Sequence, residues 1–189
     1  MLTAVDICVD VTDKRILWNI STGVKRGEIL AIMGPSGSGK TTLLNAIARY
    51  IPISKGNVFV DGVDLSVDST ARNTMSYVMQ NELFFEDLTL RETLVHSTLL
   101  RLSYKMSFKK KLQKVDEIIE SLGLVDCQNT IVGGPQHRGL SGGEKKRLSI
   151  ACELALQANI FLLDEPTSGL DSTAAFSLFT TLKLSLIHI

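Results

Sequence analysis

The sequence predicts an α/β protein: a core with a mostly parallel sheet, an N-terminal antiparallel β part and an inserted α-helical subdomain. An apolar run at residues 29–33 is followed by a glycine-rich loop and then by apolar residues at helical spacing. A second apolar run, residues 160–163, ends in two acids, and α/β sheets bind ligands at such carboxyl ends of strands. Between these runs lie segments with helical capping signals. Strands that alternate with helices predict this class.

The 189 residues are enough for one domain of ordinary size. We expect a core of residues 1–83 and 158–189, and a helical subdomain of residues 84–157. Lys plus Arg and Asp plus Glu each number 20, and this neutral balance disfavours a protein that coats nucleic acid. Three scattered cysteines indicate neither a zinc site nor a disulfide framework. No run suits a signal peptide or a membrane span, so the chain itself is expected to be soluble.

The core elements follow from apolar patterns and turn residues. Strands are expected at residues 3–11, 16–21, 29–33, 57–60, 75–79 and 160–163. Turns are expected at residues 12–13, 25–27 and 61–62. The first helix should run from the glycine-rich loop to about Tyr50, because Ile51 precedes a proline.

Three further helices are predicted from their first residues. Thr89 and Ser141 each stand three residues before a glutamate, which is the capping-box pattern; these helices should reach about Leu102 and Gln157. The third helix covers residues 109–122, with Gly123 as its stop. Its three initial lysines, residues 109–111, could bind nucleic acid or lipid, but the acids that follow on the same helix favour a solvated face.

The glycine-rich loop carries the most specific signal. It consists of Gly34, Pro35, Ser36, Gly37, Ser38, Gly39, Lys40, Thr41 and Thr42. This pattern between a strand and a helix is typical of a P-loop NTPase core. Backbone amides would surround the phosphates at the helix N-terminus, Lys40 would reach the β- and γ-phosphates, and the Thr41 hydroxyl would bind Mg²⁺. A ligand-free strand–helix turn is the alternative.

Asp164 and Glu165 follow the apolar run at residues 160–163. Beside a phosphate loop this is the Walker B pattern, in which Asp164 holds Mg²⁺ directly or through water. Glu165 is placed to polarise a water against the γ-phosphate. Four apolar residues and an aspartate are common by chance, so the alternative is an aspartate that caps a turn and a glutamate in solvent.

The run from Leu140 to Glu144, together with the two Walker motifs and the Ser168–Asp171 segment, resembles the nucleotide-binding domain of the ATP-binding-cassette (ABC) family. The resemblance extends from about Ile16 to Leu182. The sequences of these motifs are most similar to those of subfamily G, the White/Brown type, whose members transport hydrophobic or lipid-like substrates. The resemblance therefore implies hydrolysis of ATP with Mg²⁺ to drive transport.

The resemblance also implies roles for single residues. Gln80 resembles the Q-loop glutamine, a Mg²⁺ ligand that links the nucleotide to the transmembrane domain, and Glu165 resembles the catalytic base. Ser141, Gly142 and Gly143 resemble the signature that binds the γ-phosphate of ATP held by a second domain, of the same or another kind. Asp171 closes the D-loop, which reaches the partner site. A free helix N-terminus at Ser141 is a suitable anion site, and two such termini in one chain exceed the need of one ATP.

Two departures from the family pattern stand out. No aromatic residue near residues 11–15 is available to stack on adenine, and Trp18 is expected in the core. The family pattern ends after Leu182, so we expect an incomplete domain, without the transmembrane domain of the parent protein, which would place it on the cytoplasmic face of a membrane. His188 should then lie at a frayed or helical end, and the chain should bind ATP but hydrolyse it poorly.

Two other functions remain as alternatives. A soluble ABC ATPase of translation or DNA maintenance is disfavoured by the neutral charge and by the short interval from Lys40 to Ser141, which leaves no room for a long coiled coil. A module that binds ATP without turnover is disfavoured by the presence of Lys40, Asp164 and Glu165.

Overall fold

The structure, a computed structural model, describes residues 1–11, 14–68, 74–80, 83–156 and 158–187. The chain divides into two compact units. The sheet unit comprises residues 1–77, 159–164 and 186–189, and the helical unit comprises residues 78–158 and 165–185.

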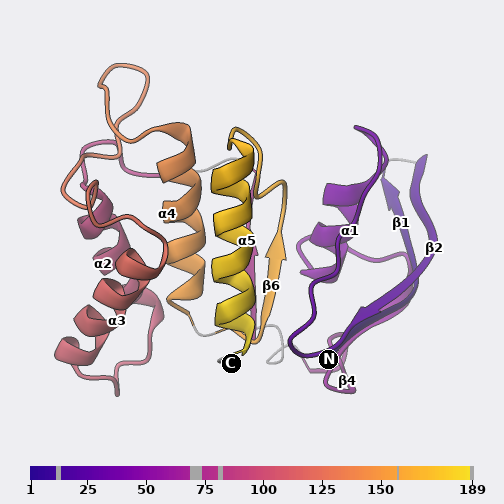
Figure 1. Ribbon diagram of the computed structural model, residues 1–189. Helices are drawn as coiled ribbons and strands as arrows, with labels where there is room; N and C mark the ends of the chain where they lie inside the picture. Colours follow the sequence, from indigo (N-terminus) through magenta and orange to yellow (C-terminus); the bar gives the residue numbers. More distant parts are fainter. Residues whose placement is uncertain (12–13, 69–73, 81–82, 157, 188–189) are drawn as a thin grey trace. The chain divides into compact units, whose positions relative to one another are not determined.

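The sheet unit contains the predicted N-terminal antiparallel β part. Strands β1 (Leu2–Val11), β2 (Lys14–Val24), β3 (Lys55–Val60) and β4 (Val63–Asp64) form a sheet in the order β2-β1-β3-β4 (Figure 1). The three neighbouring pairs are antiparallel. Asp61 and Gly62 join β3 to β4 with positive φ angles of 49° and 84°, as a tight hairpin turn of this hand requires.

Helix α1 (Lys40–Ile47) packs against β1 and β2 within this unit. Its buried face is formed by Leu43, Leu44, Ala46 and Ile47, which share a core with Ile7 and Val58 of the sheet. The helix ends before the predicted Tyr50, because Arg49 adopts a left-handed φ of 59°, a conformation that a helix cannot continue. This packing anchors the C-terminal side of the phosphate loop.

The remaining strands of the sheet unit are β5 (Met75–Val78) and β6 (Ile160–Leu163), which form a two-stranded sheet. The prediction of a buried strand at residues 29–33 is wrong. This segment is not in a strand and pairs with no strand among the described residues, and its side chains are exposed except for the half-buried Ile32. An apolar run becomes a strand only where a neighbour supplies hydrogen bonds to its backbone.

The helical unit contains the three predicted helices and α5 (Ser172–Ile187). Helices α2 (Leu90–Arg101), α3 (Phe108–Ser121) and α4 (Gly142–Leu154) pack on one another (Figure 1). Each buries apolar side chains, among them Leu94, Val115 and Leu148. Both predicted capping boxes are present, with Thr89 at α2 and Ser141 at α4. Gly123 follows α3 with a φ of 63°, which confirms it as the stop.

The predicted solvated face of α3 is only partly correct. Lys109 and Lys110 are exposed, whereas Lys111 is buried. The Lys111 ammonium donates to the backbone oxygens of Leu99 and Leu102, at 3.3 and 3.0 Å. These carbonyls belong to the C-terminal end of α2, which is electronegative. Lys111 therefore fastens the start of α3 to the end of α2.

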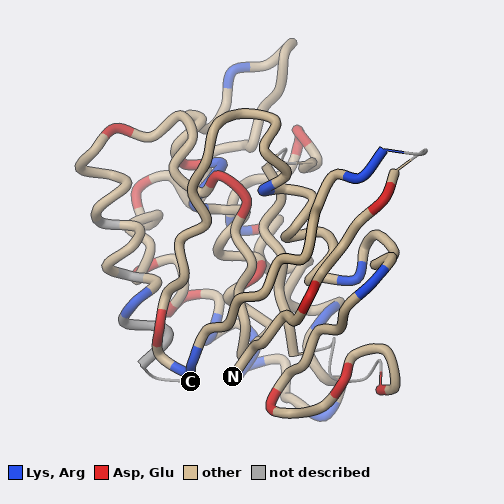
Figure 2. Tube along the Cα trace, turned by 90° about the vertical axis from the view of Figure 1, so that its right-hand side faces the viewer, with Lys and Arg blue, Asp and Glu red and all other residues tan. Residues whose placement is uncertain are grey.

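The prediction that Trp18 lies in the core is also wrong, since 71% of this residue is exposed. Leu17, its neighbour on β2, is buried instead, because successive side chains point to opposite faces of a strand. Arg15 stacks over the Trp18 ring, 4.8 Å from its centroid, and pairs with Asp10 at 2.7 Å. Figure 2 shows that both acidic and basic residues occur along the N-terminal strands.

Three expectations fall on residues outside those described. These are the turn at Thr12 and Asp13, the helix end at about Gln157 and the position of His188. Within the described ranges, none of the helices has the length and apolar character needed to cross a membrane.

Candidate functional site

The glycine-rich loop of the sheet unit is open to solvent. Residues 34–38 are exposed and residues 39–40 are half-buried. Gly37 and Gly39 have φ angles of 78° and 93°, which side chains with a Cβ rarely adopt. At Gly39 a Cβ would also come within 2.9 Å of the Leu17 side chain, so glycine is required there both for conformation and for space.

Helix α1 begins at this loop without a side-chain cap. Its N-cap is Gly39, which supplies no side-chain hydrogen bond, and no acid lies in its first turn. The first amide groups of a helix have no partner within the helix, and the helix dipole makes this end electropositive. The loop therefore leaves backbone donors available to an anion.

Lys40 lies against the loop that it follows. Its ammonium donates to the backbone oxygens of Gly34 and Pro35, at 3.0 and 2.8 Å. Its side chain thus folds back over the loop. An arriving phosphate could replace the two carbonyl oxygens as a stronger, charged acceptor.

Thr41 and Asp164 meet in the sheet unit. The Thr41 hydroxyl donates to the carboxylate of Asp164 at 3.2 Å, although 123 positions separate them. Asp164 is buried at the end of β6. Burial, with the nearby charge of Asp164 as the next cause, raises the pKa of Tyr77 to about 12. The structure therefore brings the end of the glycine-rich loop and Asp164 together.

The Thr41 and Asp164 oxygens suit Mg²⁺. Magnesium prefers oxygen ligands and usually takes one or two carboxylates from the protein while keeping water and phosphate oxygens. Among the described residues, no cluster of three or more His, Cys, Asp or Glu side chains could hold a metal.

Gln80 and Glu165 form a pair in the helical unit. The Gln80 amide nitrogen donates to a Glu165 carboxylate oxygen at 3.0 Å, which leaves the Gln80 amide oxygen for another contact. Glu165 is exposed and has a left-handed φ of 49°. Such a conformation is uncommon for residues other than glycine, asparagine and aspartate. Residues that adopt it are found preferentially at functional sites.

Lys146 supports this pair from helix α4. Its side chain is buried, and its ammonium donates to the backbone oxygens of Met79 and Gln80 at 3.3 and 3.4 Å. The sequence prediction missed this residue. Its burial could have been predicted from its spacing in the helix. Lys146 precedes the buried Ile150 by four positions and so lies on the same buried face.

The signature residues form the start of α4. The Ser141 hydroxyl accepts from the Glu144 amide at 3.3 Å, and the Glu144 carboxylate accepts from the Ser141 amide at 2.7 Å. The bond from the Ser141 backbone lowers the pKa of Glu144. A Cβ at Gly142 would meet nothing within 4 Å, whereas one at Gly143 would come 3.0 Å from Leu170. The exposed side of this terminus is thus at Gly142.

The D-loop segment precedes α5. Gly169 has a φ of 77°, and the exposed Asp171 accepts from the Ala174 amide at 2.7 Å. Asp171 therefore caps α5, a structural task that the resemblance did not imply. Leu170 packs against Gly143, so the D-loop and the signature are neighbours within the helical unit.

The family model described as "ABC transporter" matches residues 17–168. The chain belongs to the ABC transporter family. The match includes the phosphate loop, the signature and Asp164, and it ends at Ser168.

The similarity to subfamily G is confirmed by two relatives from Arabidopsis thaliana, each 45% identical. ABC transporter G family member 22 matches over 86% of this chain and 22% of its own length, and member 14 over 90% and 26%. The chain thus spans about a quarter of the length of these curated relatives.

Solved structures confirm the α/β fold of a P-loop NTPase. An ATP-binding subunit of an ABC transporter superposes with a TM-score of 0.79 at 24% identity, covering 99% of this chain and 75% of that one. A dimeric ATP-binding cassette in a post-hydrolysis state, bound to ADP and Pi, also gives 0.79, at 27% identity with 98% and 83% covered.

Proposed function

We propose that this chain is the nucleotide-binding domain of a subfamily G ABC transporter, which binds and hydrolyses Mg-ATP to drive transport of a lipid-like or hydrophobic substrate. The observation that carries the proposal is the phosphate loop, in which an uncapped helix terminus, Lys40 and the Thr41–Asp164 pair occur together. Family membership and the similarity to the G family members support the same function.

The phosphate loop is the proposed site for the triphosphate. Backbone N–H groups of residues 36–42 would surround the β- and γ-phosphates, and Lys40 would exchange its two carbonyl acceptors for phosphate oxygens. Thr41 and Asp164 would hold the Mg²⁺ of the substrate, and the free amide oxygen of Gln80 is proposed as a further ligand.

Glu165 is the proposed general base. Its carboxylate accepts a proton from water as the water oxygen bonds to the γ-phosphorus and the bond to the leaving oxygen of ADP breaks, which yields ADP and phosphate. The Gln80 amide orients this carboxylate through the bond at 3.0 Å. A proton acceptor at this position contributes on the order of 10² to 10⁴ in rate.

The signature at α4 is proposed to act on ATP held by a second nucleotide-binding domain, identical or different. Gly142 is open to solvent at a helix N-terminus, and Asp171 is proposed to approach the partner nucleotide. The dimeric state of the similar ATP-binding cassette that was solved with ADP and Pi supports this arrangement.

A complete transporter would also contain a transmembrane domain, which would place this domain at the cytoplasmic face of a membrane. We propose residues 1–83 and 158–189 as the ATP-binding core and residues 84–157 as the helical subdomain. Compared with the compact units, this division moves Gln80 and residues 165–185 from the helical unit to the core. Nucleic acid is not a proposed partner, given the neutral charge.

Light scattering tests the proposal directly. The Glu165→Gln chain should dimerise when Mg-ATP is added, because bound ATP persists without hydrolysis. The same chain with Lys40→Ala should stay monomeric, whereas Lys55→Ala, an exposed lysine away from the loop, should dimerise as before. Dimerisation that ignores ATP, or that survives Lys40→Ala, would contradict a nucleotide sandwiched between two phosphate-binding termini.

A further inference from the structure

The turn between α2 and α3 carries a concentration of positive charge. Residues 93–115 contain six Lys or Arg and no Asp or Glu, although the whole chain is neutral with 20 of each sign. Three of the six are occupied elsewhere or shielded: Arg101 pairs with Glu153 at 2.6 Å, Lys111 caps α2, and Lys114 is half-buried. The other three, Lys105, Lys109 and Lys110, are exposed and, among the described residues, enter no ion pair.

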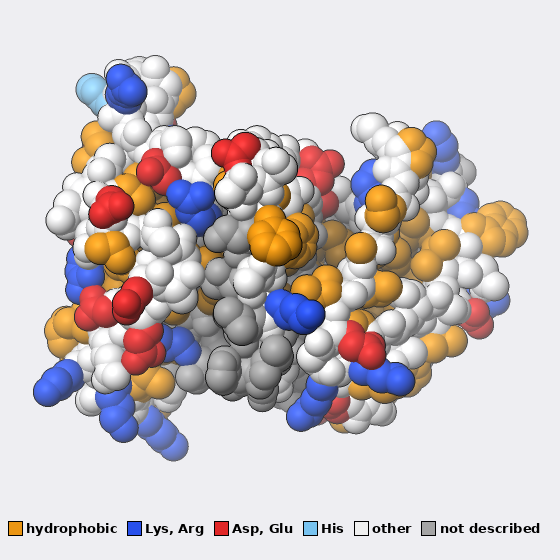
Figure 3. Space-filling model, viewed as in Figure 1, with side chains coloured by type: hydrophobic (Ala, Val, Ile, Leu, Met, Phe, Trp, Pro, Cys, Tyr) orange, Lys and Arg blue, Asp and Glu red, His pale blue; other side chains and the backbone are white. Residues whose placement is uncertain are grey.

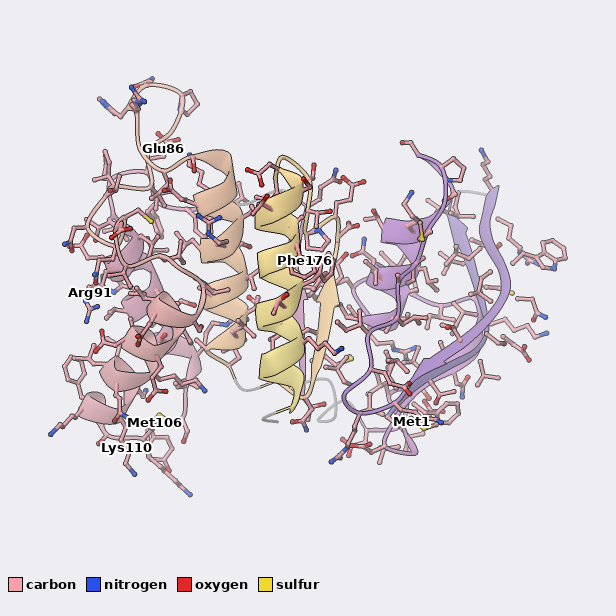
Figure 4. The ribbon with its side chains drawn as sticks, in the orientation of Figure 1. Met1, Glu86, Arg91, Met106, Lys110 and Phe176 are labelled. Atoms are coloured by element: carbon pink, nitrogen blue, oxygen red, sulfur yellow. The ribbon has the colours of Figure 1, made fainter. Side chains whose placement is uncertain are left out.

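The same turn exposes large apolar side chains. Leu100 is 85% exposed, Tyr104 89% and Phe108 61%. Figure 4 labels Met106 and Lys110 at this end of the helical unit, and Figure 3 shows Lys and Arg side chains gathered around it. We call the surface of Leu100, Tyr104, Phe108 and the three free lysines the α2–α3 tip.

Hydrogen bonds define the conformation of the tip, because the Lys111 ammonium donates to two carbonyls at the end of α2. Ser107 caps α3 by accepting from the Lys110 amide. The exposed apolar groups are therefore held outward by a defined turn.

We propose that the α2–α3 tip docks on an anionic lipid surface. Lysines beside aromatic and aliphatic side chains match the boundary between headgroups and acyl chains, where the charges meet lipid phosphates and carboxylates while the apolar groups enter the membrane. A nucleic acid would use the lysines but would leave Leu100 without an apolar partner. A second copy of the tip would bring like charges together. This proposal is independent of the nucleotide site.

The tip is a weak anchor alone, because stable attachment to membranes normally takes two signals. In a chain already tethered to a membrane, the effective concentration would make such contact frequent. Docking would then orient the helical unit, which contains the signature and the Gln80–Glu165 pair, relative to the lipid surface.

Vesicle flotation of the 189-residue chain tests the proposal. Vesicles of phosphatidylcholine with 30% phosphatidylserine should bind the chain, and pure phosphatidylcholine should bind it far less. Lys105→Gln, Lys109→Gln and Lys110→Gln together should weaken binding about a hundredfold, since each basic residue contributes about fivefold at an anionic surface. The matched control replaces the exposed Lys14, Lys25 and Lys55 of the sheet unit with Gln, removes the same charge and should bind like the original chain.

A second variant separates membrane contact from simple charge attraction. Tyr104→Gln with Phe108→Gln should lower binding about tenfold, for two partly inserted aromatic side chains, and this loss should persist in 1 M salt, where charges are screened. The docking proposal is overturned if the control triple variant loses binding equally, if no vesicle binds, or if the double variant binds normally. It is also overturned if soluble glycerophosphoserine displaces the chain at millimolar concentration, or if duplex DNA binds as tightly and depends on the same lysines.

Discussion

The N-termini of α1 and α4 are both proposed to bind phosphate, yet they are built differently. Helix α1 begins at Gly39 with no side-chain cap and no acid in its first turn. Helix α4 begins with a complete capping box, in which Glu144 is both a hydrogen-bond partner of Ser141 and a negative charge in the first turn. The first terminus leaves its donors free, while the second has satisfied part of its own.

This difference indicates the order in which the two termini would bind a phosphate. A free anion meets unpaired amides and a lysine at α1, whereas at α4 it meets a carboxylate whose lowered pKa keeps it charged. The α4 terminus therefore suits a phosphate that another site already holds. Binding should be a property of α1, and α4 should contribute only after two chains meet.

The largest effect is expected from a variant that leaves both termini intact. In the full-length parent transporter, Glu165→Gln should slow single-turnover hydrolysis by about 10² to 10⁴, because an amide cannot accept the proton of water, while ATP affinity stays within about twofold. Quenched-flow measurement of phosphate formation checks this. Near-normal hydrolysis would move the catalytic role to another residue.

Lys40→Ala removes the charged side chain proposed to bind phosphate at the N-terminus of α1. Loss of the ammonium that contacts the loop carbonyls should weaken Mg-ATP binding about a hundredfold, the equivalent of one strong charge-assisted hydrogen bond or two ordinary ones. Calorimetry measures the affinity, and Lys55→Ala is the control. An unchanged affinity would sink the assignment of the phosphate loop.

Ser141→Ala sharpens the contrast through stability rather than binding. The change removes a cap that accepts from the Glu144 amide and should lower the free energy of unfolding by about 1 kcal/mol. Urea denaturation followed by circular dichroism checks this. Helix α1 has no comparable side-chain cap to lose. If Ser141→Ala left the free energy of unfolding unchanged within error, the two termini would not differ in capping.

The charge of Glu144 gives the smallest effect. Its pKa is lowered in the folded chain, chiefly by the bond from the Ser141 backbone, so it stabilises the fold above its unfolded pKa and loses this effect as pH falls through its folded pKa. Glu144→Gln keeps a capping side chain without charge. The wild-type advantage should therefore be present at pH 7 and shrink below about pH 4.5; an advantage that grows in acid would contradict this sign.

The sequence predicted elements whose signals are local. The capping boxes at Thr89 and Ser141, the turn at Gly62 and the stop at Gly123 all depend on residues within a few positions. The contact of Thr41 with Asp164 was predictable because both belong to motifs of known spatial relation.

The misses depend on distant neighbours. An apolar run cannot tell whether a partner strand exists, so residues 29–33 were assigned to a strand that the structure does not form. Trp18 was expected in the core, but the alternation along β2 buries Leu17 instead. The burial of Lys111 and Lys146 was not predicted, because lysine is usually exposed. Both nevertheless lie on the buried faces of their helices.

One comparison of affinities tests the central distinction most directly. Gly142→Asp places a carboxylate at the start of α4, where even a Cβ meets nothing within 4 Å, so the fold should tolerate it. Calorimetry on monomeric chain should give wild-type Mg-ATP affinity for this variant, while ATP-driven dimerisation in the Glu165→Gln background is lost through repulsion of the γ-phosphate. If monomer affinity instead falls as much as dimerisation, α4 binds the chain's own nucleotide and the division of labour between the two termini is wrong.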